Sequence, residues 1–504
     1  MKKLYIISIA FFGLLFTSCD SYLDINQDQS SPSEENMTAD IMMPAAEINL
    51  ATSYGDYLRI ASGYFAQYYG QLFGTSNYVD YSEFTMSATR SSGTYLQLNT
   101  RVLGSINTIV KKAQATGDNG TILAAKAIKA FTYQTLVDCY GEVPYSEAFD
   151  VSNTAPKYDE GVDIYAGILA ELDEALAAVK SSDQVCKNFL YGKGKTSSVS
   201  DWVKFANAVK LRILTRESGV VDVKSKLDAL IAENNFPTSD VQFAGIWKDE
   251  QNAASPFYSE EFSLWKSQEN LTANLAIINT LIQTTDNGES YIDPRISSFF
   301  NSNENKEYTG SVGGTNFSTS KKYKAAFWCR PVATYDMPVV LMPLCEIDFM
   351  ISEYYATLGS NTTKATEYYN KAIEASFASA GVDGAADYIS KFPFDATNYK
   401  KSIGVAKWTA LCGLDPFEGY CELRRLGYPA FGSVDGTDLY DEDTDTYNPG
   451  KLPAATLYTP IHVFNEVGTN KLLQRWPYAE SSATRNGNTP KFKGYTEPIF
   501  WAKK

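Results

Sequence analysis

The hydrophobic and polar residues of this chain alternate mainly with the period of an α-helix. Residues 201–217, "DWVKFANAVKLRILTRE", show this most clearly, with apolar side chains three or four positions apart at Trp202, Phe205, Ala206, Val209 and Ile213. Such a stripe is typical of an amphipathic helix that buries one face. Ser200 or Asp201 is suited to cap its first turn. We therefore predict a helix that begins near residue 200.

Helical patterns also occur in pairs. Residues 347–358 and 364–377 are separated by the turn "GSNTT". The second segment carries Ala365, Tyr369 and Ala372, the small-large-small spacing of a tetratricopeptide helix pair of about 34 residues. Residues 124–140 and 162–179 are candidates for a similar pair.

Strand patterns are short and scattered, as in "KYKAAFWC" (322–329) and "MPVVLM" (337–342). Residues 301–320 and 428–451 are long and polar. Loops longer than about 12–15 residues tend to be functional or disordered. The pattern predicts a mostly α fold, with tetratricopeptide-type helix pairs that carry long loops and a few short strands.

The start of the chain has a different pattern. Two lysines precede an almost unbroken apolar run at residues 4–16, which is too short for a membrane span of roughly 20 residues but suits a secretory signal. The small residues Thr17 and Ser18 stand directly before Cys19, an arrangement typical of bacterial lipoproteins. We predict a lipoprotein signal peptide at residues 1–18 and lipidation of Cys19. An ordinary signal peptide with an incidental cysteine is the alternative.

The polar stretch after Cys19 is rich in Asn, Gln, Ser and acidic residues. Residues 19–40 are therefore predicted to be a lipidated flexible tether. No later segment approaches the length of a membrane span, and no Pro/Gly/Ser linker divides the interior. We predict one ligand-binding domain at residues 41–504.

Charge narrows the class of ligand. The net charge of −15 makes DNA and RNA poor ligands, because their binding depends on neutralising phosphates. Polyanionic substrates are disfavoured for the same reason, unless a local basic pocket overrides the overall charge. Six cysteines follow Cys19 without a C-x-x-C pair, so we predict no zinc site and leave any disulfide pairing open.

Each stretch that resembles a catalytic or cofactor-binding motif lacks residues that the motif requires. His462 is the one histidine and is predicted to be structural, because no nucleophile motif accompanies it. The stretch "YGKGKTSS" resembles a phosphate loop but has Phe189 where its first glycine belongs. Residues 441–452 resemble a calcium loop, but Thr446 and Leu452 stand where the loop needs Gly and Glu. We predict no enzyme activity, cofactor or metal.

Five stretches in order resemble the SusD/RagB family of outer-membrane nutrient-binding lipoproteins, in its SusD-like branch. They are "CDSYLDINQD", "AAKAIKAFTYQTLVDCYGEVPYSEAF", "LYGKGKTSSVSDWVKFANAVKLRI", "EGYCELRRLGYP" and "QRWPYAE". The resemblance runs from Cys19 to about Trp501. It also accounts for the failed phosphate loop, which is the turn before a family helix.

The resemblance implies a fold and a function. The fold is mostly helical, with tetratricopeptide-like pairs as a scaffold. The protein is lipid-anchored at the outer membrane, facing the cell exterior, and lies as a lid over a SusC-like TonB-dependent transporter. It captures an oligosaccharide, or else a peptide, and passes it to that transporter. A surface glycoside hydrolase and a scaffold that binds only protein are the alternatives from other classes.

Sugar binding needs exposed rings beside amides or carboxylates. In residues 54–84 the first aromatic positions, Tyr57, Tyr64 and Tyr68 with Ala61, keep helical spacing and are predicted to be core. After Gly70 the period is lost, so a loop is expected to expose the next aromatic and amide side chains. The predicted ligand-binding residues are Phe73, Asn77, Tyr78 and Tyr81 there, and Tyr258, Phe262, Trp265 and Gln268 in a second polar, aromatic stretch.

Overall fold

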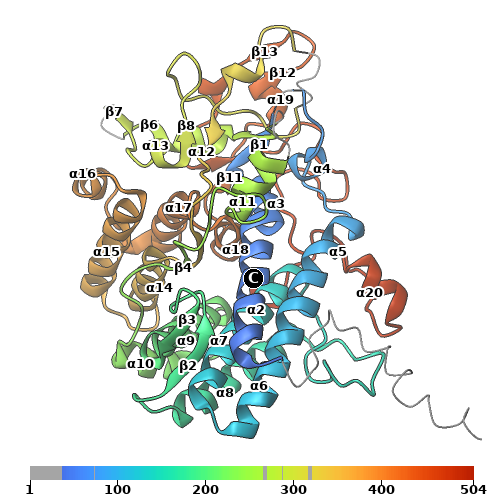
Figure 1. Cartoon of the computed structure of the whole chain (residues 1–504). Helices are drawn as coiled ribbons and strands as arrows, with labels where there is room; N and C mark the ends of the chain where they lie inside the picture. The colour runs from blue at the N-terminus through green and yellow to red at the C-terminus, as the bar shows by residue number, and fades with distance from the viewer. Residues whose placement is uncertain (1–36, 73, 265–268, 286–287, 316–319, 504) are drawn as a thin grey trace, which may run out of the picture.

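The computed structural model describes residues 37–503, apart from 73, 265–268, 286–287 and 316–319. Helices make up most of the regular structure of this part, and the longest strand has 5 residues. Figure 1 shows the long helices in the lower and left parts of the molecule, with loops and short strands gathered at the top. The predicted mostly α fold class is confirmed.

Two interrupted helical rods run through the middle of the molecule (Figure 1). The first consists of α2 (Ala39–Ser53), η3 (Tyr54–Leu58) and α3 (Arg59–Phe65). The second consists of α5 (Ala88–Leu96), η4 (Gln97–Leu103) and α6 (Gly104–Thr116), and it packs against α2. The segments η3 and η4 are π-helical turns, which insert an extra residue and are frequent at functional sites.

Antiparallel helix pairs form the scaffold around these rods. They are α7 (Asn119–Tyr140) with α8 (Gly161–Ala178), α9 (Val199–Glu217) with α10 (Lys224–Glu233), α14 (Leu344–Ala356) with α15 (Thr362–Ala380), and α17 (Tyr399–Leu411) with α18 (Pro416–Leu426). The predicted pairing of α14 with α15 and of α7 with α8 is confirmed. The cap of α9 is Ser198, whose side chain accepts from the backbone of Ser200 at 3.2 Å.

Buried arginines of α9 join four of these helices. Arg212 donates to Glu346 of α14 at 3.0 Å through Nε, and Arg216 pairs with Asp138 of α7 and Glu418 of α18. These side chains are almost completely buried. A buried charge costs several kcal/mol unless it is paired, so each ion pair fixes how the helices meet.

The strands form seven two-stranded sheets within the described residues. The pairs are β1 (Tyr69–Gln71) with β5 (Leu271–Ala273), β2 (Gln184–Asn188) with β3 (Lys195–Ser198), β4 (Val241–Phe243) with β10 (Val339–Met342), β6 (Ile282–Thr284) with β7 (Ser290–Ile292), β8 (Phe300–Asn301) with β9 (Arg330–Pro331), β11 (Ala430–Phe431) with β14 (Thr456–Leu457), and β12 (Tyr440–Asp441) with β13 (Thr446–Tyr447). All are antiparallel except β11–β14.

One of the two strand predictions is wrong. The segment "MPVVLM" contains β10, but "KYKAAFWC" forms the 3₁₀ turn η7 (Ala325–Phe327). The rings of Tyr323, Phe327 and Trp328 pack against one another, with centroids 4.8–5.9 Å apart. They form one aromatic cluster with Tyr447, so their side chains do not alternate across a sheet.

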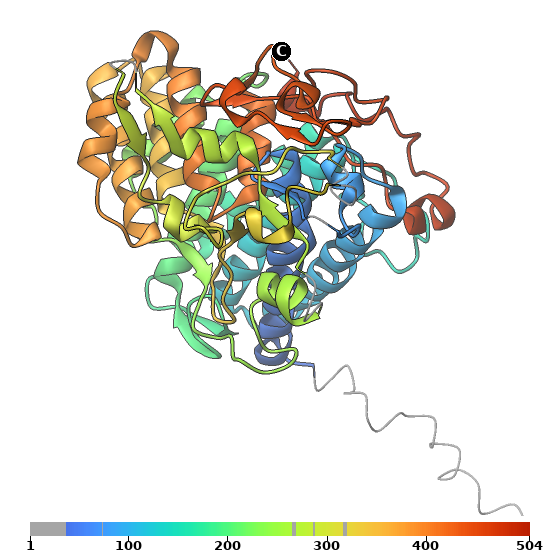
Figure 2. The same cartoon turned by 90° about the horizontal axis from the view of Figure 1, so that it is seen from above.

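Short helical segments complete the regular structure. They are α4 (Val79–Ser82), α11 (Pro256–Tyr258), η5 (Ser259–Leu264), α12 (Leu275–Leu281), α13 (Ile296–Phe299), α16 (Ala385–Lys391), η8 (Ala396–Asn398), α19 (Gly436–Leu439), η9 (Pro449–Lys451), α20 (Glu480–Arg485) and η10 (Phe500–Ala502). The view from above in Figure 2 agrees with Figure 1 that the orange helices α14–α17 and the red helix α20 lie on opposite sides of the blue N-terminal helices.

The main hydrophobic core draws on residues from Met42 to Trp501. All six cysteines after Cys19 are buried and unbridged. Among the residues described, no helix has both the length and the apolar character that crossing a bilayer requires.

Candidate functional site

The π-helical turn η3 changes which side chains face the core. Asp56 has φ −111° and ψ −112°, outside the helical region, and the helix resumes after it. The turn rotates Tyr57 outward, so that 41% of it is exposed, while Tyr54 and Leu58 stay buried. The prediction that Tyr57 belongs to the core is therefore wrong, whereas Ala61, Tyr64 and Tyr68 are buried as predicted.

A pocket of about 270 Å³ opens beside Tyr57, between the two interrupted rods. We call it the Tyr57 pocket. One wall comes from α2 and η3, and the other from α5 and η4. It is lined by Thr52, Ser53, Asp56, Tyr57, Gly93, Thr94, Leu96, Gln97 and Arg101. Leu96 is 43% exposed and, with the Tyr57 ring, supplies an apolar surface.

Two acceptor oxygens of this pocket have no hydrogen-bond partner among the described residues. They are Oδ1 of Asp56 and Oε1 of Gln97, and both atoms are buried. A buried polar atom without a partner costs about 1–3 kcal/mol. Both π-helical turns therefore present an unsatisfied oxygen to the same pocket, which a ligand with hydroxyl or amide donors would satisfy.

The electrostatics of the pocket favour the protonated form of Asp56. Burial, with Glu260 nearby, raises the pKa of Asp56 well above its usual range. A protonated carboxyl both donates and accepts hydrogen bonds. Burial and the neighbouring carboxylates also raise the pKa of Tyr57 to about 12, so its phenol stays protonated.

Glu260 of η5 contributes to the raised pKa of Tyr57. Its carboxylate accepts a hydrogen bond from the Tyr78 hydroxyl at 3.2 Å. The next residue, Glu261, accepts from the backbone N–H groups of Asn270 and Leu271, and burial raises its pKa to about 7. Both acids anchor η5 to its surroundings.

Tyr78 and Tyr81 are not exposed on a loop, so that prediction is wrong. Each is only 1% exposed. They stack on each other with centroids 5.8 Å apart and planes 7° apart, and both contact Tyr64 of α3. The short helix α4 turns this polar segment inward, which the loss of helical period in the sequence did not reveal.

The other predicted ligand residues lie near this region or outside the described part. Tyr258 and Phe262 are half-buried and stack with centroids 5.7 Å apart. Asn77 is half-buried, and its amide donates to Asn270 at 3.0 Å. Phe73, Trp265 and Gln268 lie outside the described residues. Ligand contact by these residues remains a prediction.

Sequence reasoning missed Asp56, Leu96, Gln97 and Arg101. None belongs to a motif, and their proximity results from the packing of α2 and η3 against η4. The one available signal was the "YGDYL" stretch at residues 54–58, where an acidic residue interrupts an otherwise apolar helical segment.

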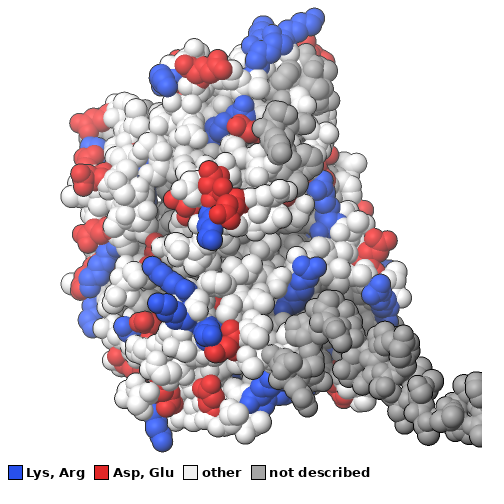
Figure 3. Space-filling model, viewed as in Figure 1, with Lys and Arg blue, Asp and Glu red and all other residues white. Residues whose placement is uncertain are grey.

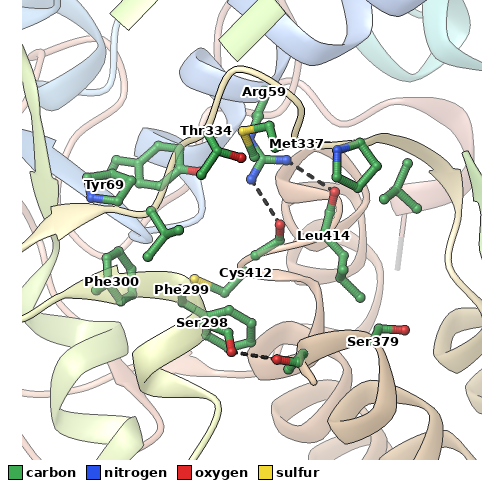
Figure 4. A pocket seen from close by; sticks show the side chains of 16 residues that line it. Arg59, Tyr69, Ser298, Phe299, Phe300, Thr334, Met337, Ser379, Cys412 and Leu414 are labelled. Carbon is green, nitrogen blue, oxygen red and sulfur yellow. Dashed lines mark hydrogen bonds between the residues drawn. The ribbon is translucent and has the colours of Figure 1, made fainter. Parts of the chain in front are cut away.

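Figure 4 shows a second cavity, of about 180 Å³, between α3, α13 and the end of α17. Its walls are mainly apolar. Arg59 points its guanidinium at the carbonyl oxygens of Gly413 and Leu414, at 3.0 and 3.2 Å, and Ser298 donates to Ala380 at 2.6 Å. Nε of Arg59 is buried without a partner among the described residues, but it is a donor in a mainly apolar cavity of smaller volume than the Tyr57 pocket.

A more open groove of about 500 Å³ lies near β6 and β13. Its amide donor, Asn279, is used internally, since Nδ2 donates to the carbonyls of Pro449 and Leu452 at 2.9 Å each. Tyr447 donates to Gly310 at 2.7 Å. No atom that lines this groove is among the buried polar atoms left unpaired in the described residues.

In the acidic segment that resembles a calcium loop, other groups of the protein donate the hydrogen bonds that Asp445 accepts. Asp445 accepts from the backbone N–H groups of Lys321 and Lys322 at 2.9 Å each, and from the Tyr440 hydroxyl at 2.6 Å. His462 bonds Glu442 at 2.8 Å on the surface. Among the described residues, the one cluster with metal-ligand composition is Asp138, Glu418 and Cys421, and Arg216 pairs with both of its carboxylates.

Charge is dispersed on the face shown in Figure 3. Basic and acidic side chains are scattered singly or in small groups among uncharged residues. This face carries no extended basic surface of the kind that binds nucleic acids.

The fold and site define a helical binding protein with a small pocket of mixed aromatic and polar character. The family model described as "Starch-binding associating with outer membrane" matches residues 30–449. The chain belongs to this SusD-like family. It is thus a member of a family of outer-membrane-associated binding proteins, not of enzymes.

Solved structures agree on the fold. A SusD homologue from Bacteroides uniformis superposes with a TM-score of 0.71 at 20% identity, covering 91% of this chain and 99% of that one. A chitin-binding SusD homologue from Flavobacterium johnsoniae gives 0.67 at 17%, covering 91% and 98%. A SusD homologue from Bacteroides vulgatus gives 0.66 at 19%, covering 88% and 91%. No curated protein matches the sequence.

Proposed function

We propose that this protein captures an oligosaccharide at the Tyr57 pocket and passes it to a SusC-like TonB-dependent transporter. The observation that carries the proposal is the exposed Tyr57 ring beside two unpaired oxygens, Asp56 Oδ1 and Gln97 Oε1. A sugar offers C–H faces that pack on an aromatic ring and hydroxyls that bind such oxygens. The family description and the chitin-binding relative support a glycan as the ligand.

The half-buried pair Tyr258–Phe262 and the amide of Asn77 extend this proposed site on the side of Glu260. Tyr258 and Phe262 flank Glu260 in the chain, and Asn77 precedes Tyr78, which donates to that acid. We keep Phe73, Trp265 and Gln268 in the proposal, because each lies within a few residues of these groups in the sequence.

The proposal also includes the anchor. A lipid on Cys19, cleavage after residue 18 and a tether over residues 19–40 would hold the domain at the outer membrane, facing the exterior. The apolar run before Cys19 supports this, as does the family's outer-membrane association. Stable anchoring requires more than one acyl chain, at about 0.8 kcal/mol per buried CH₂. Intact mass spectrometry of the mature protein tests it, and a mature chain that begins elsewhere or lacks lipid would refute it.

Calorimetry of the full chain in detergent, against neutral oligosaccharides, acidic oligosaccharides and peptides, tests capture. We expect sugar binding that Tyr57→Ala abolishes and Tyr57→Phe largely keeps, because the ring supplies the stacking face. Tyr335→Ala is the matched control, since Tyr335 is 39% exposed and lines no part of the Tyr57 pocket. Binding that survives Tyr57→Ala would overturn the proposed site, and binding of peptides alone would favour the peptide alternative.

A further inference from the structure

The arginines of this chain fall into two groups. Most donate to a carboxylate or to a backbone carbonyl; these are Arg59, Arg90, Arg212, Arg216, Arg295, Arg330, Arg424, Arg425 and Arg475. Arg101 and Arg485 have neither an ion pair nor a hydrogen bond to any described residue. The other nine arginines show that pairing is the rule in this chain of net charge −15, so the two arginines without an ion pair stand apart.

Both unpaired arginines line pockets on the same helical rod. Arg101 lines the Tyr57 pocket. Arg485, at the end of α20, lines a second pocket of about 270 Å³ that we call the Arg485 pocket. This pocket lies between α5, α20 and the loop before α8. Leu96 lines both pockets, so the two pockets adjoin at this exposed side chain of α5.

Figures 1 and 2 show this arrangement, with α5 lying between α2 and α20. A helix with its side chains is roughly 10–12 Å across. A ligand that reaches from one pocket over Leu96 into the other is therefore longer than one sugar ring.

The Arg485 pocket also has an unsatisfied group. The hydroxyl of Ser481 is buried and has no hydrogen-bond partner among the described residues. Other polar groups of this pocket are paired, since Asn486 donates to the carbonyl of Pro156 at 2.8 Å, and the Tyr158 hydroxyl accepts from Thr489 at 3.2 Å. Arg485 and Ser481 are thus available to a ligand, as are the polar side chains of Asn99, Thr100 and Thr154 in the same lining.

Few carboxyl groups line either pocket. No Asp or Glu lines the Arg485 pocket. The one carboxyl that lines the Tyr57 pocket is Asp56, whose pKa burial raises well above its usual range. Glu260 is buried and does not line the pocket. An arginine with no competing carboxylate is the side chain best suited to bind carboxylate or sulfate, because its planar fork donates two parallel hydrogen bonds.

We propose that the captured ligand is an acidic oligosaccharide, whose carboxylate or sulfate groups are bound by Arg101 in one pocket and Arg485 in the other. The inference rests on the proposed function and specifies its substrate class. The chain's negative charge then selects against long polyanions, while these two local cations accept a short acidic sugar.

The test compares a galacturonate tetramer, its fully methyl-esterified form and a sulfated oligosaccharide of the same length, by calorimetry on the full chain in detergent. We expect at least one acidic ligand to bind more than tenfold tighter than the ester. Arg101→Gln and Arg485→Gln should each weaken that binding about tenfold, in line with the loss of a charge-assisted hydrogen bond, and weaken ester binding by a clearly smaller factor. The acidic ligand should also bind less tightly as salt increases.

Lys226→Gln is the matched control, because it removes an equal charge from the exposed surface of α10, far from α20 in Figure 1. Ester or neutral sugar that binds as tightly as the acidic forms, with loss only in Tyr57→Ala, would overturn this inference and leave the proposed function standing. Arginine variants that behave like Lys226→Gln would also overturn it. If no oligosaccharide binds, both fail.

Discussion

The Tyr78 hydroxyl donates a 3.2 Å hydrogen bond to Glu260, a residue 182 positions away in the chain. The same carboxylate also helps to raise the pKa of the exposed Tyr57. One buried acid thus acts on a core tyrosine and on the tyrosine that faces the pocket. This relationship separates two roles that the sequence could not tell apart, since both residues stand in one tyrosine-rich stretch.

Tyr78 substitutions should affect folding before binding. Tyr78→Ala removes a buried ring that stacks on Tyr81, and we expect a loss of about 3–5 kcal/mol in the free energy of unfolding. Tyr78→Phe removes only the hydrogen bond to Glu260 and should cost about 1.5–3 kcal/mol. Denaturant unfolding measures both. A Tyr78→Phe protein with wild-type stability and no sugar binding would instead place Tyr78 in direct contact with the ligand.

The ion pairs of α9 should be the most sensitive charges of the scaffold. Glu346→Ala leaves Arg212 buried with one partner fewer, and removal of one member of a buried pair costs about 3–5 kcal/mol. Glu367→Ala is the matched control, because Glu367 pairs with Lys371 on the surface, where solvent screens the pair and its removal should leave stability nearly unchanged. Thermal unfolding compares the two variants, and equal shifts in Tm would contradict the structural role of Arg212.

Stability should fall between about pH 4.5 and pH 8 because of Glu47. This side chain is fully buried, and burial raises its pKa from 4.5 to about 8, although backbone N–H groups of Phe189 and Leu190 lower it in part. The folded protein therefore binds a proton more tightly than the unfolded chain does. The stabilisation is complete below pH 4.5 and is lost as the pH rises through 8.

Glu47→Gln tests this directly, because glutamine cannot ionise, although its single oxygen can accept from only one of the two N–H groups, which bond to different oxygens of Glu47. The difference in unfolding free energy between variant and wild type should grow in favour of the variant as pH rises from 4.5 to 8. Parallel stability curves over this range would show that Glu47 does not titrate as the structure implies.

Chelators should leave the protein unchanged. The cluster of Asp138, Glu418 and Cys421 has metal-ligand composition, but the guanidinium of Arg216 pairs with both carboxylates and supplies the positive charge they require. We expect the same Tm with and without EDTA by differential scanning calorimetry. A drop in Tm that added Zn²⁺ reverses would show instead that a metal competes with Arg216.

Much of the scaffold was predictable because helical periodicity is local. Two patterns correspond to the buried face of a helix in the structure. They are the stripe from Trp202 to Ile213 and the small-large-small spacing of Ala365, Tyr369 and Ala372. The error at residues 322–329 has the opposite cause. Alternating aromatic residues there pack into a cluster with Tyr447, a contact that no local pattern encodes.

The site was predictable only in its neighbourhood. A dense tyrosine stretch indicated the region around η3 and α4. The prediction assigned its exposed and buried tyrosines the wrong way round, since Tyr57 faces the pocket and Tyr78 and Tyr81 lie in the core. The reason is the π-helical turn, which rotates the residues of η3 relative to a regular helix. Arg101 and Arg485 carry no sequence signal, since what distinguishes them is the absence of a neighbouring carboxylate.

The sequence by itself determined the helix pairs, the acidic character of the chain and its resemblance to a family, because these depend on residue type and short-range spacing. Only the tertiary structure decided which tyrosine meets solvent, which acid has a raised pKa and which arginines are unpaired. Burial, pKa and ion pairing depend on groups brought together from distant parts of the chain, as Glu260 meets Tyr78 and Leu96 lines two pockets.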